Sequence, residues 1–447
     1  EIRLSLVGSE MCIRDSILPF FISCNNDEIA PIEAEKIILN HTSIELKGSN
    51  TFQLTATISP LNTTDKEITW ESSDTTIVSV NNSGVVKSIN IGSAEITAST
   101  NDNKSAICEI TVTTSGSWDK KADFANGTGR HGAISFSIGD KSYVGLGSDY
   151  QYDYDIFGGD PPTSHGGFKN DFWEYNPETD TWRQLNDFPG EKRTEAIGFS
   201  FNGKGYVGLG EYLAIEPDEN GLNSQTGFKQ DFWEYNPDND TWKQLSDFPG
   251  EGRLKPIGFA INNKGYVGFG GYYDKRDFWE FSPSDNSWNR LADYPGESSG
   301  GVVGFSIDNK GYVGFGLNLD DYLPSTDFWE YTPETNSWNE KQSAKIPTYY
   351  DATGPDASAT FYATGFSFNG EGYICLDVNS VWKYNPTSDE WTGLIEPFPS
   401  AGNNRLKSKT NFVVNGKAFL GLGLNFSICG NHCQTGIPSF SIYQFVY

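Results

Sequence analysis

Residues 198–210 read Gly-Phe-Ser-Phe-Asn-Gly-Lys-Gly-Tyr-Val-Gly-Leu-Gly, and this stretch decides the fold. Its central Asn-Gly-Lys-Gly is a strong signal for a tight hairpin turn, and short apolar runs flank it on both sides. The block recurs at 258–270 and 304–316, and more loosely around Tyr143, Tyr373 and Phe419. Recurrence of one hairpin at intervals of roughly 50 residues indicates an architecture built from structural repeats.

Two further blocks follow each hairpin. The first reads Asp171-Phe-Trp-Glu-Tyr-Asn-Pro177 and predicts a third strand that ends in a proline-containing turn. The second begins with a tryptophan and predicts a fourth strand. Copies of the first block start at Asp171, Asp231, Asp277, Asp327 and Val381, and copies of the second start at Trp182, Trp242, Trp288, Trp338 and Trp391. We expect most of these tryptophans, and the tyrosines of the second strands, to pack between repeats.

Residues 116–447 resemble Kelch repeats, in the small residues that close the second strand, the aromatic residue of the third and the tryptophan of the fourth. The resemblance implies a β-propeller, and the hairpin count implies six blades. The chain ends after a third strand at Ser439–Val446, whereas Ser117-Trp118 before the first blade reads as a fourth strand. We therefore expect this N-terminal strand to complete the sixth blade and close the ring, which removes exposed sheet edges.

Residues 34–113 alternate apolar and polar residues in short runs that are separated by turn residues, a pattern typical of a β-sandwich. They resemble the bacterial Ig-like domain, group two, in 68–74, 78–80, 92–98 and 110–112, with Trp70 expected in the core. In related surface proteins such modules act as spacers or adhesive units. The predicted fold class is all-β: an Ig-like β-sandwich followed by a six-bladed Kelch β-propeller closed by an N-terminal outer strand.

The N-terminal segment carries signals for export. Residues 1–16 show no periodicity and read as a non-native segment, so they are set aside from the fold. Residues 17–33 contain Ile-Leu-Pro-Phe-Phe-Ile-Ser-Cys24, which resembles the end of a lipoprotein signal peptide, and Asp27-Glu28 resembles a surface-export signal of Gram-negative lipoproteins. We expect lipidation of Cys24 and an outer-membrane or cell-surface location, with contact to the membrane only through the lipid anchor. The alternative is a secretory signal that happens to end in cysteine.

Charge excludes some partners, and the cysteines fit an exported protein. A net charge of −27 argues against nucleic acid and against a polybasic membrane patch.

Cys108 and Cys375 lie in apolar runs and are expected to be buried thiols. Cys429 and Cys433 are the only close pair; we expect a disulfide there rather than a metal site, which would need more ligands than these two and His432.

Strand alternation predicts that the long connections emerge on one face of the propeller. They cover 148–170, 211–230, 317–326, 343–360 and 424–439, and long connections on a compact scaffold are often functional. The aromatic candidates for ligand contact on this face are Tyr150, Tyr152, Tyr154, Tyr212, Tyr272 and Tyr273. We expect no cofactor or metal, although Asp149, Asp153 and Asp155 could together bind Ca²⁺.

Four arginines come just before the innermost strand of four blades: Arg130, Arg193, Arg253 and Arg405. One hypothesis places them at the pore mouth, where guanidinium groups would bind a carboxylate of an acidic sugar. The alternative is a structural role, in which each arginine binds backbone carbonyls or a neighbouring carboxylate such as Glu191 or Glu251.

The sequence contains no recognisable catalytic motif, which favours a protein that is not an enzyme. We find no nucleophile motif and no arrangement of histidines and tyrosines for a copper site of the galactose oxidase kind. The leading hypothesis is a monomeric, surface-anchored protein whose propeller binds a glycan or a protein. The alternative is a sugar epimerase, because some six-bladed Kelch proteins are exported N-acetylneuraminate epimerases; Arg193 with Glu191 or Glu195 would then be the catalytic candidates.

Overall fold

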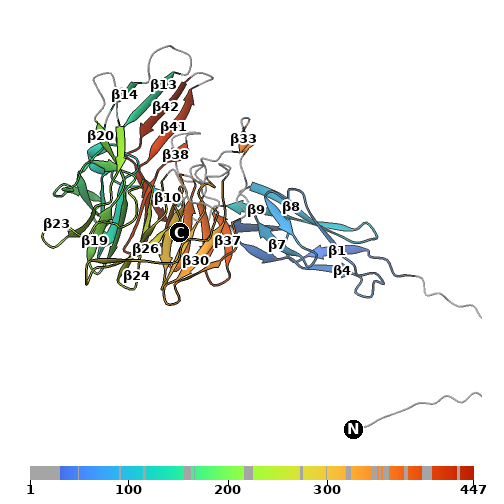
Figure 1. Cartoon of the computed structure of the whole chain (residues 1–447). Coiled ribbons are helices and arrows are strands. Elements are labelled where there is room, and N and C mark those ends of the chain that lie inside the picture. Colours follow the sequence, from blue (N-terminus) through green and yellow to red (C-terminus); the bar gives the residue numbers. More distant parts are fainter. Residues whose placement is uncertain are drawn as a thin grey trace, which may run out of the picture.

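The structure is a computed structural model, and Figure 1 shows the whole chain. It describes residues 31–48, 50–89, 92–113, 117–155, 163–165, 167–215, 225–271, 275–297, 300–318, 324–344, 350–351, 354–355, 362–376, 381–394, 405–429 and 433–446. In these ranges the protein is almost entirely β-structure, with one short 3-10 helix, η1 (Phe124–Gly127). No helix among the described residues is long and apolar enough to span a membrane.

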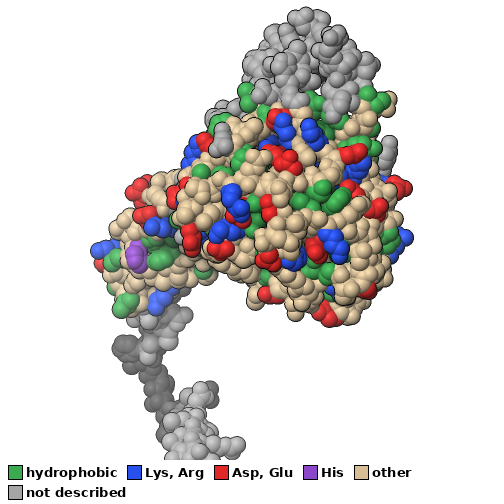
Figure 2. All heavy atoms as spheres, turned by 90° about the vertical axis from the view of Figure 1, so that its left-hand side faces the viewer, with side chains coloured by type: hydrophobic (Ala, Val, Ile, Leu, Met, Phe, Trp, Pro, Cys, Tyr) green, Lys and Arg blue, Asp and Glu red, His purple; other side chains and the backbone are tan. Residues whose placement is uncertain are grey.

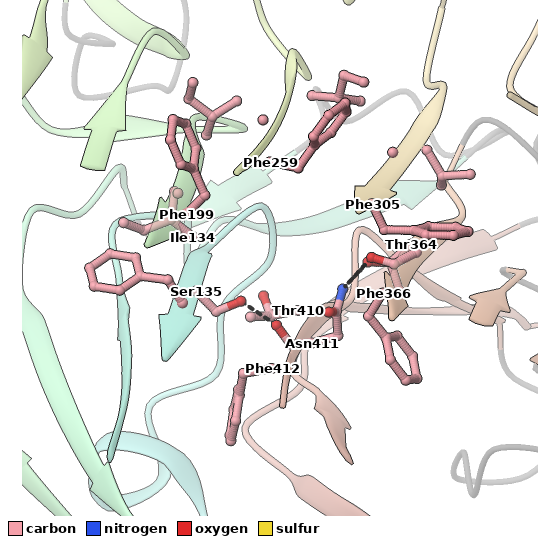
Figure 3. A pocket seen from close by; sticks show the side chains of 18 of the residues that line it. Ile134, Ser135, Phe199, Phe259, Phe305, Thr364, Phe366, Thr410, Asn411 and Phe412 are labelled. Atoms are coloured by element: carbon pink, nitrogen blue, oxygen red, sulfur yellow. Dashed lines mark hydrogen bonds between the residues drawn. The ribbon is translucent and has the colours of Figure 1, made fainter. Parts of the chain in front are cut away.

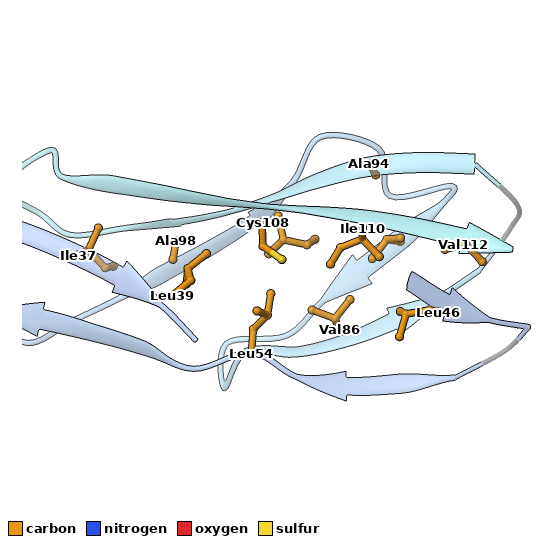
Figure 4. Packing of buried hydrophobic residues seen from close by; sticks show 12 residues of the cluster. Ile37, Leu39, Leu46, Leu54, Val86, Ala94, Ala98, Cys108, Ile110 and Val112 are labelled. Carbon is orange, nitrogen blue, oxygen red and sulfur yellow. The ribbon is translucent and has the colours of Figure 1, made fainter. Parts of the chain in front are cut away.

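The N-terminal part is a β-sandwich, as the sequence predicts. Its sheets are β1 (Lys36–Leu39) with β4 (Ala56–Ser59); β2 (Ser43–Lys47), β9 (Ser105–Thr113), β8 (Gly92–Ser99) and β5 (Thr69–Ser72); and β3 (Thr51–Gln53), β7 (Val85–Ser88) and β6 (Val78–Val80). Leu54, Val86, Ile110 and Cys108 are buried between the sheets (Figure 4). Trp70 is partly buried and packs against this cluster. The core therefore forms from the inward-facing half of each alternating strand.

Six four-stranded antiparallel sheets follow, one for each predicted repeat. They are β11 (Ile134–Ile138), β12 (Lys141–Gly145), β15 (Phe172–Asn176), β16 (Thr181–Gln184); β18 (Ile197–Phe201), β19 (Lys204–Gly208), β22 (Phe232–Asn236), β23 (Thr241–Gln244); β24 (Ile257–Ile261), β25 (Lys264–Gly268), β26 (Phe278–Ser282), β27 (Ser287–Arg290); β28 (Val303–Ile307), β29 (Lys310–Gly314), β30 (Phe328–Thr332), β31 (Ser337–Glu340); β34 (Thr364–Phe368), β35 (Glu371–Cys375), β36 (Val381–Asn385), β37 (Glu390–Leu394); and β39 (Thr410–Val414), β40 (Lys417–Gly421), β43 (Ile442–Val446), β10 (Ser117–Lys120). The first strand of each blade contacts that of the next, and β39 contacts β11, so the blades form a closed ring.

The N-terminal strand closes this ring. β10 pairs with β43 in antiparallel register, with Trp118 opposite Phe445 and Lys120 opposite Tyr443. The Trp118 and Phe445 rings lie 5.0 Å apart. The predicted completion of the sixth blade by residues near Trp118 is thus confirmed.

Aromatic side chains join one blade to the next. Phe232 of the second blade contacts Phe281 and Trp288 of the third, with ring centroids 5.0 Å apart in both cases. The indole N–H of Trp288 donates to the backbone oxygen of Ser246, 3.0 Å away, on the preceding blade. These contacts confirm that the repeat aromatics serve inter-blade packing.

The connections on one face are more ordered than the predicted loops. β14 (Thr163–His165), β13 (Gln151–Asp155), β42 (Cys433–Pro438), β41 (Leu424–Cys429) and β38 (Arg405–Lys407) form one sheet, which rises from the propeller in Figure 1. Smaller sheets join β17 (Arg193–Thr194), β20 (Glu211–Ile215) and β21 (Gln225–Phe228), and β32 (Tyr350–Asp351) and β33 (Gly354–Pro355). Because β13 pairs with β42, this sheet bridges the first and sixth blades at the junction where the ring closes.

Candidate functional site

Three of the four predicted arginines are structural. Arg130, Arg193 and Arg253 are only 0–1% exposed. Each forms a bidentate salt bridge with the aspartate that immediately precedes the third strand of its own blade. The pairs are Arg130–Asp171, Arg193–Asp231 and Arg253–Asp277, with nitrogen–oxygen distances of 2.5–2.9 Å. The predicted contact between these arginines and a ligand is not supported, because their guanidinium groups are buried within the blades and each is paired with an aspartate.

Arg193 shows how completely the group is occupied. Besides Asp231 it donates to the backbone oxygens of Leu209 and Glu191, both 3.0 Å away, and it lies 4.9 Å from the centre of the Phe188 ring. Burial raises the pKa of the Asp231 carboxyl, but the hydrogen bonds and charge of Arg193 lower it by more, so its pKa lies below the ordinary value. The pair is thus ionic at neutral pH. Only the backbone of Arg405, in β38, is described.

A different set of side chains lines the mouth of the axial channel. The position two residues before the first strand of each blade is occupied by Gly132, Glu195, Lys255, Gly301, Tyr362 and Ser408. These residues line a cavity of about 140 Å³. At this position, two blades have glycine, and each of the other four blades has a different residue type.

The backbone at this position is unusual. Glu195, Lys255 and Ser408 have φ angles of 51°, 48° and 49°, in the left-handed region that costs a residue with a side chain about 1 kcal/mol or more. This conformation allows backbone hydrogen bonds to link neighbouring blades around the mouth. The Lys255 N–H donates to the Glu195 backbone oxygen over 3.0 Å, and the Glu195 N–H donates to the Gly132 backbone oxygen over 2.9 Å. The ring thus holds these side chains at fixed positions on the rim.

The rim side chains form one interacting cluster. Ser408 Oγ donates to Glu195 Oε1 over 2.7 Å, and Lys255 Nζ lies 3.8 Å from the same oxygen. Lys255 Nζ also lies 3.9 Å from the centre of the Tyr362 ring, and Lys407 Nζ lies 4.8 Å from it. Two ammonium groups thus lie beside one aromatic ring, and the Glu195 carboxylate lies beside one of them.

His131 lies beside this cluster. Burial lowers the pKa of its imidazole; the Glu195 carboxylate opposes this shift and the Lys255 ammonium reinforces it, and the net pKa lies below the ordinary value. The imidazole is therefore neutral at pH 7 and can accept or donate a proton.

Below the mouth, the first strands enclose an axial channel of about 460 Å³ (Figure 3). Ala133, Val302 and Lys409 line both the mouth and the channel, so the two spaces adjoin. Within the channel, Asn411 Nδ2 donates to Thr364 Oγ1 over 2.5 Å, and Ser135 donates to the Asn411 backbone oxygen. The described lining is uncharged apart from Lys409 at the rim, whose Nζ donates to the Leu376 oxygen over 2.8 Å.

The other predicted site residues lie at different distances from the mouth. Glu195 is at the rim, whereas Glu191 is 58% exposed and pairs with Lys229, which also lies 3.9 Å from the Tyr212 ring centre. Tyr150 is half-buried and contacts Phe168. Outside the described residues lie Cys24, Tyr272 and Tyr273 entirely, and the side chains of Tyr152, Tyr154 and Arg405.

The predictions on metals and cysteines have mixed outcomes. Asp149 pairs with Lys169 at 2.6 Å, and no group of three potential metal ligands occurs among the described residues. The side chains of Asp153 and Asp155 are not described. Cys108 and Cys375 are buried free thiols, as predicted. The strand register places Cys429 opposite Cys433, but their side chains lie outside the described set, so the disulfide stays a prediction.

Sequence reasoning missed Lys255, Tyr362, Lys407 and Ser408. For Lys255, Tyr362 and Ser408 the signal was available, because aligning the six first strands shows that the position two residues before them changes from glycine to glutamate, lysine, tyrosine and serine. The arginines were favoured instead because their recurrence is easier to see than a position that varies.

The fold and the site define a β-propeller with an N-terminal Ig-like sandwich and a charged axial mouth. Residues 33–110 match the bacterial Ig-like domain (group 2). The chain is 26% identical over 139 residues to N-acetylneuraminate epimerase of Haemophilus influenzae, which is 31% of each chain. It is also 41% identical over 71 residues to lacto-N-biosidase of Bifidobacterium bifidum, which is 16% of this chain and 6% of that one.

These matches are partial. An uncharacterized protein of Clostridium acetobutylicum is 39% identical over 92 residues, 20% of this chain and 10% of the relative. The chain thus spans at most 31% of the length of the curated relatives named here. The solved structure of YjhT aligns with a TM-score of 0.48 at 14% identity, over 69% of this chain and 97% of that one.

Proposed function

We propose that the propeller binds an acidic carbohydrate at its axial mouth. The observation that carries this proposal is the cluster of Lys255, Lys407 and Tyr362 beside Glu195 and Ser408. Similarity over part of the chain to an enzyme named for an acidic sugar supports the same ligand class. The proposal keeps the expected face and ligand but moves the positive charge from the arginines to the lysines.

Each rim group has a distinct chemical task. An ammonium group attracts a carboxylate as a point charge, and Lys255 is 13% exposed, so solvent screens it only in part. The Tyr362 ring holds both lysines near one another although they carry like charges. Glu195 and Ser408 can both accept hydrogen bonds from sugar hydroxyls, since the hydroxyl hydrogen of Ser408 is donated to Glu195.

Face-wide charge does not by itself select the ligand. On the face shown in Figure 2, acidic and basic side chains are interspersed, without one large basic area. The proposal therefore rests on the local cluster of lysines at the mouth and not on a basic area of this side of the surface.

Export and anchoring complete the proposal. With Cys24 lipidated, the Ig-like domain would hold the propeller away from the membrane, in the arrangement of a surface binding protein. Binding without turnover is the leading role.

The test is a glycan array followed by titration calorimetry on residues 31–447. We expect acidic sugars to bind, and Lys255→Gln to weaken binding by tenfold or more, because a charge-assisted contact contributes about 1.5–3 kcal/mol. Lys204→Gln is the matched control, since Lys204 lies in β19 at the hairpin turn, where its Nζ is 2.6 Å from Asn236 Oδ1. Equal weakening by both changes in folded protein would place the site elsewhere.

One observation favours a second candidate function, the exchange of sugar anomers. This reaction needs a group that removes a proton from the anomeric hydroxyl and a group that protonates the ring oxygen. Glu195 lines the mouth, and the neutral imidazole of His131, next to Gly132 in the chain, is close enough to feel the charge of Glu195. Of the three predicted catalytic residues, Arg193, Glu191 and Glu195, only Glu195 lines the mouth cavity and is a candidate for this proton transfer.

Magnetization-exchange NMR on N-acetylneuraminate separates the two functions. Faster exchange between anomers that is lost in Glu195→Gln supports an isomerase. Binding with no faster exchange supports a binding protein.

A further inference from the structure

Lys409 is the one charged residue in the layer of residues directly below the rim. The residue that immediately precedes the first strand of each blade lines both the mouth cavity and the channel. In blades one to five this residue is small or apolar: Ala133, Ala196, Pro256, Val302 and Ala363. In blade six it is Lys409, which is only 6% exposed. The repeat therefore changes at this layer in a single blade, and the change introduces a charge.

The side chain of Lys409 extends from blade six to blade five. Its Nζ donates to the backbone oxygen of Leu376, 2.8 Å away, directly after β35. Asn411, two residues along the chain, lines the channel and also reaches blade five, where its Nδ2 donates to Thr364 Oγ1 over 2.5 Å. Because alternate residues of an extended chain share one face, Lys409 and Asn411 both lie on the side of the axis.

The contact with Leu376 uses a position that arginine occupies in other blades. The three buried arginines donate in the same way to the residue that follows the second strand of their own blade, which is Leu146, Leu209 or Phe269. Blade five has Thr360 at the arginine position and Ser380 at the aspartate position. Lys409 of the neighbouring blade therefore supplies the cation at this point, and unlike the arginines it also lines the mouth.

Burial makes this ammonium group an effective partner for an anion. A charge that is enclosed by protein is screened less by water and salt than an exposed one, so its attraction for an opposite charge is stronger. The hydrogen bond to Leu376 also fixes the position of Nζ before a ligand arrives. A group that is already in place costs less conformational entropy when it binds.

The size and lining of the mouth cavity indicate which part of a ligand enters it. Its volume of about 140 Å³ is below the roughly 300–1,000 Å³ usual for complete small-molecule sites, so it accepts one group of a ligand. Its charged lining residues are Glu195, Lys255 and Lys409. Glu195 lies beside Lys255, whereas no carboxylate from the described parts of blades five and six lines the cavity. An anionic group is therefore favoured on the side where Lys409 and Thr364 lie.

We infer that Lys409 binds the carboxylate of the acidic ligand inside the mouth cavity, on the side of blades five and six. The inference rests on the proposed function and adds to it the residue and the side of the mouth that bind the anion. The remainder of the sugar is too large for this cavity and stays at the rim, beside Lys407 and Tyr362. The ligand class is thereby narrowed to sugars with a free carboxylate, because an ester has no charge to pair with a buried ammonium group.

The test compares N-acetylneuraminic acid with its methyl ester, which has the same ring but no negative charge. Titration calorimetry should show that the unaltered protein binds the acid about a hundredfold more tightly, as charge-assisted contacts of about tenfold each with Lys255 and Lys409 predict. Lys409→Gln keeps a donor for the Leu376 oxygen but removes the charge. It should lower the preference for the acid about tenfold and leave the affinity for the ester unchanged, whereas Lys409→Arg should keep the preference.

The matched control is Lys417→Gln, which removes an exposed lysine of the same blade at the end of β39 that is distant from the mouth. It should change neither affinity. If Lys409→Gln keeps the full preference while Lys255→Gln lowers it, the inference is wrong and the proposed function stands. If Lys409→Gln weakens the binding of acid and ester equally, Lys409 only supports the fold, and the inference is again wrong.

Two further outcomes are distinguishable. Should Lys409→Gln not fold, Lys409→Met is measured in the same way, and failure of both variants to fold would assign the ammonium group to the fold and overturn its role in binding. If the unaltered protein binds neither sugar, the proposed function fails and the inference fails with it.

Discussion

Replacing Asp231 by asparagine tests whether the arginines are structural. The change keeps the size of the side chain but removes the negative charge beside Arg193, which is 0% exposed. Breaking a buried ion pair by removing one partner costs about 3–5 kcal/mol, and the 18% exposure of Asp231 points to the lower end. We therefore expect the free energy of unfolding to fall by about 3 kcal/mol, measured by urea titration of tryptophan fluorescence.

The matched control is Asp238→Asn, in the turn after β22. Asp238 is 84% exposed and lies 3.5 Å from Lys204, so losing its charge should cost less than about 1 kcal/mol. If Asp231→Asn lowers the free energy of unfolding no more than this control does, the ion pair with Arg193 does not stabilise the blade. Arg193 would then again be a candidate for ligand binding.

The same pair predicts a direction of pH dependence. The pKa of Asp231 lies below its value of 3.8 in the unfolded chain. The pair therefore contributes its full stability above that pH, and the contribution is lost as the pH falls through the lower, folded value. In Asp231→Asn this acid-dependent loss should be smaller, which urea titrations at several acidic pH values would show.

Three further predictions address the ring, the blade contacts and the anchor. Deleting Ser117–Lys120 should expose the edge of β43 and lower the melting temperature of the propeller by at least several degrees; an unchanged calorimetric transition would contradict the closure. Gly304→Ala should cost about 1–3 kcal/mol in urea titrations, because the new Cβ would lie 2.5 Å from Ile257 Cδ1, whereas Gly167→Ala meets no neighbour within 4 Å and should be nearly neutral. Cys24→Ala, in a chain with a complete signal peptide, should move the protein from the membrane fraction to the soluble one; unchanged fractionation would argue against lipidation.

The blades could be predicted because each is specified by local residues. In the second blade, the Asn-Gly-Lys-Gly turn at 202–205 sets the register of the first hairpin, and the proline turn after Tyr235 sets that of the second. The ring closure by Trp118 followed from counting strands. The sheet that joins β13 to β42 could not be predicted in this way, because its partners are distant in sequence and meet only once the ring is closed.

The role of the arginines could not be predicted from the residues next to them in the sequence. They precede the first strands of their blades in the sequence, but the direction of a side chain depends on its partner, and these side chains are enclosed within the blades. The partner of Arg193 is Asp231, which begins the repeat block Asp-Phe-Trp-Glu-Tyr and was regarded as a strand boundary. A carboxylate that recurs in the same blades as a recurrent arginine is the signal that would have identified a structural pair.

A ring of similar blades presents the same chemical group at each equivalent position unless individual residues break the repeat. A sugar has no sixfold symmetry, so a site on the axis must be built from residues that differ between blades. The mouth position varies from Gly132 and Gly301 to Glu195 and Lys255, although the side chains make its left-handed backbone less favourable. The recurrent Arg–Asp pairs maintain the blades, and the positions that depart from the repeat are the ones that can distinguish a ligand.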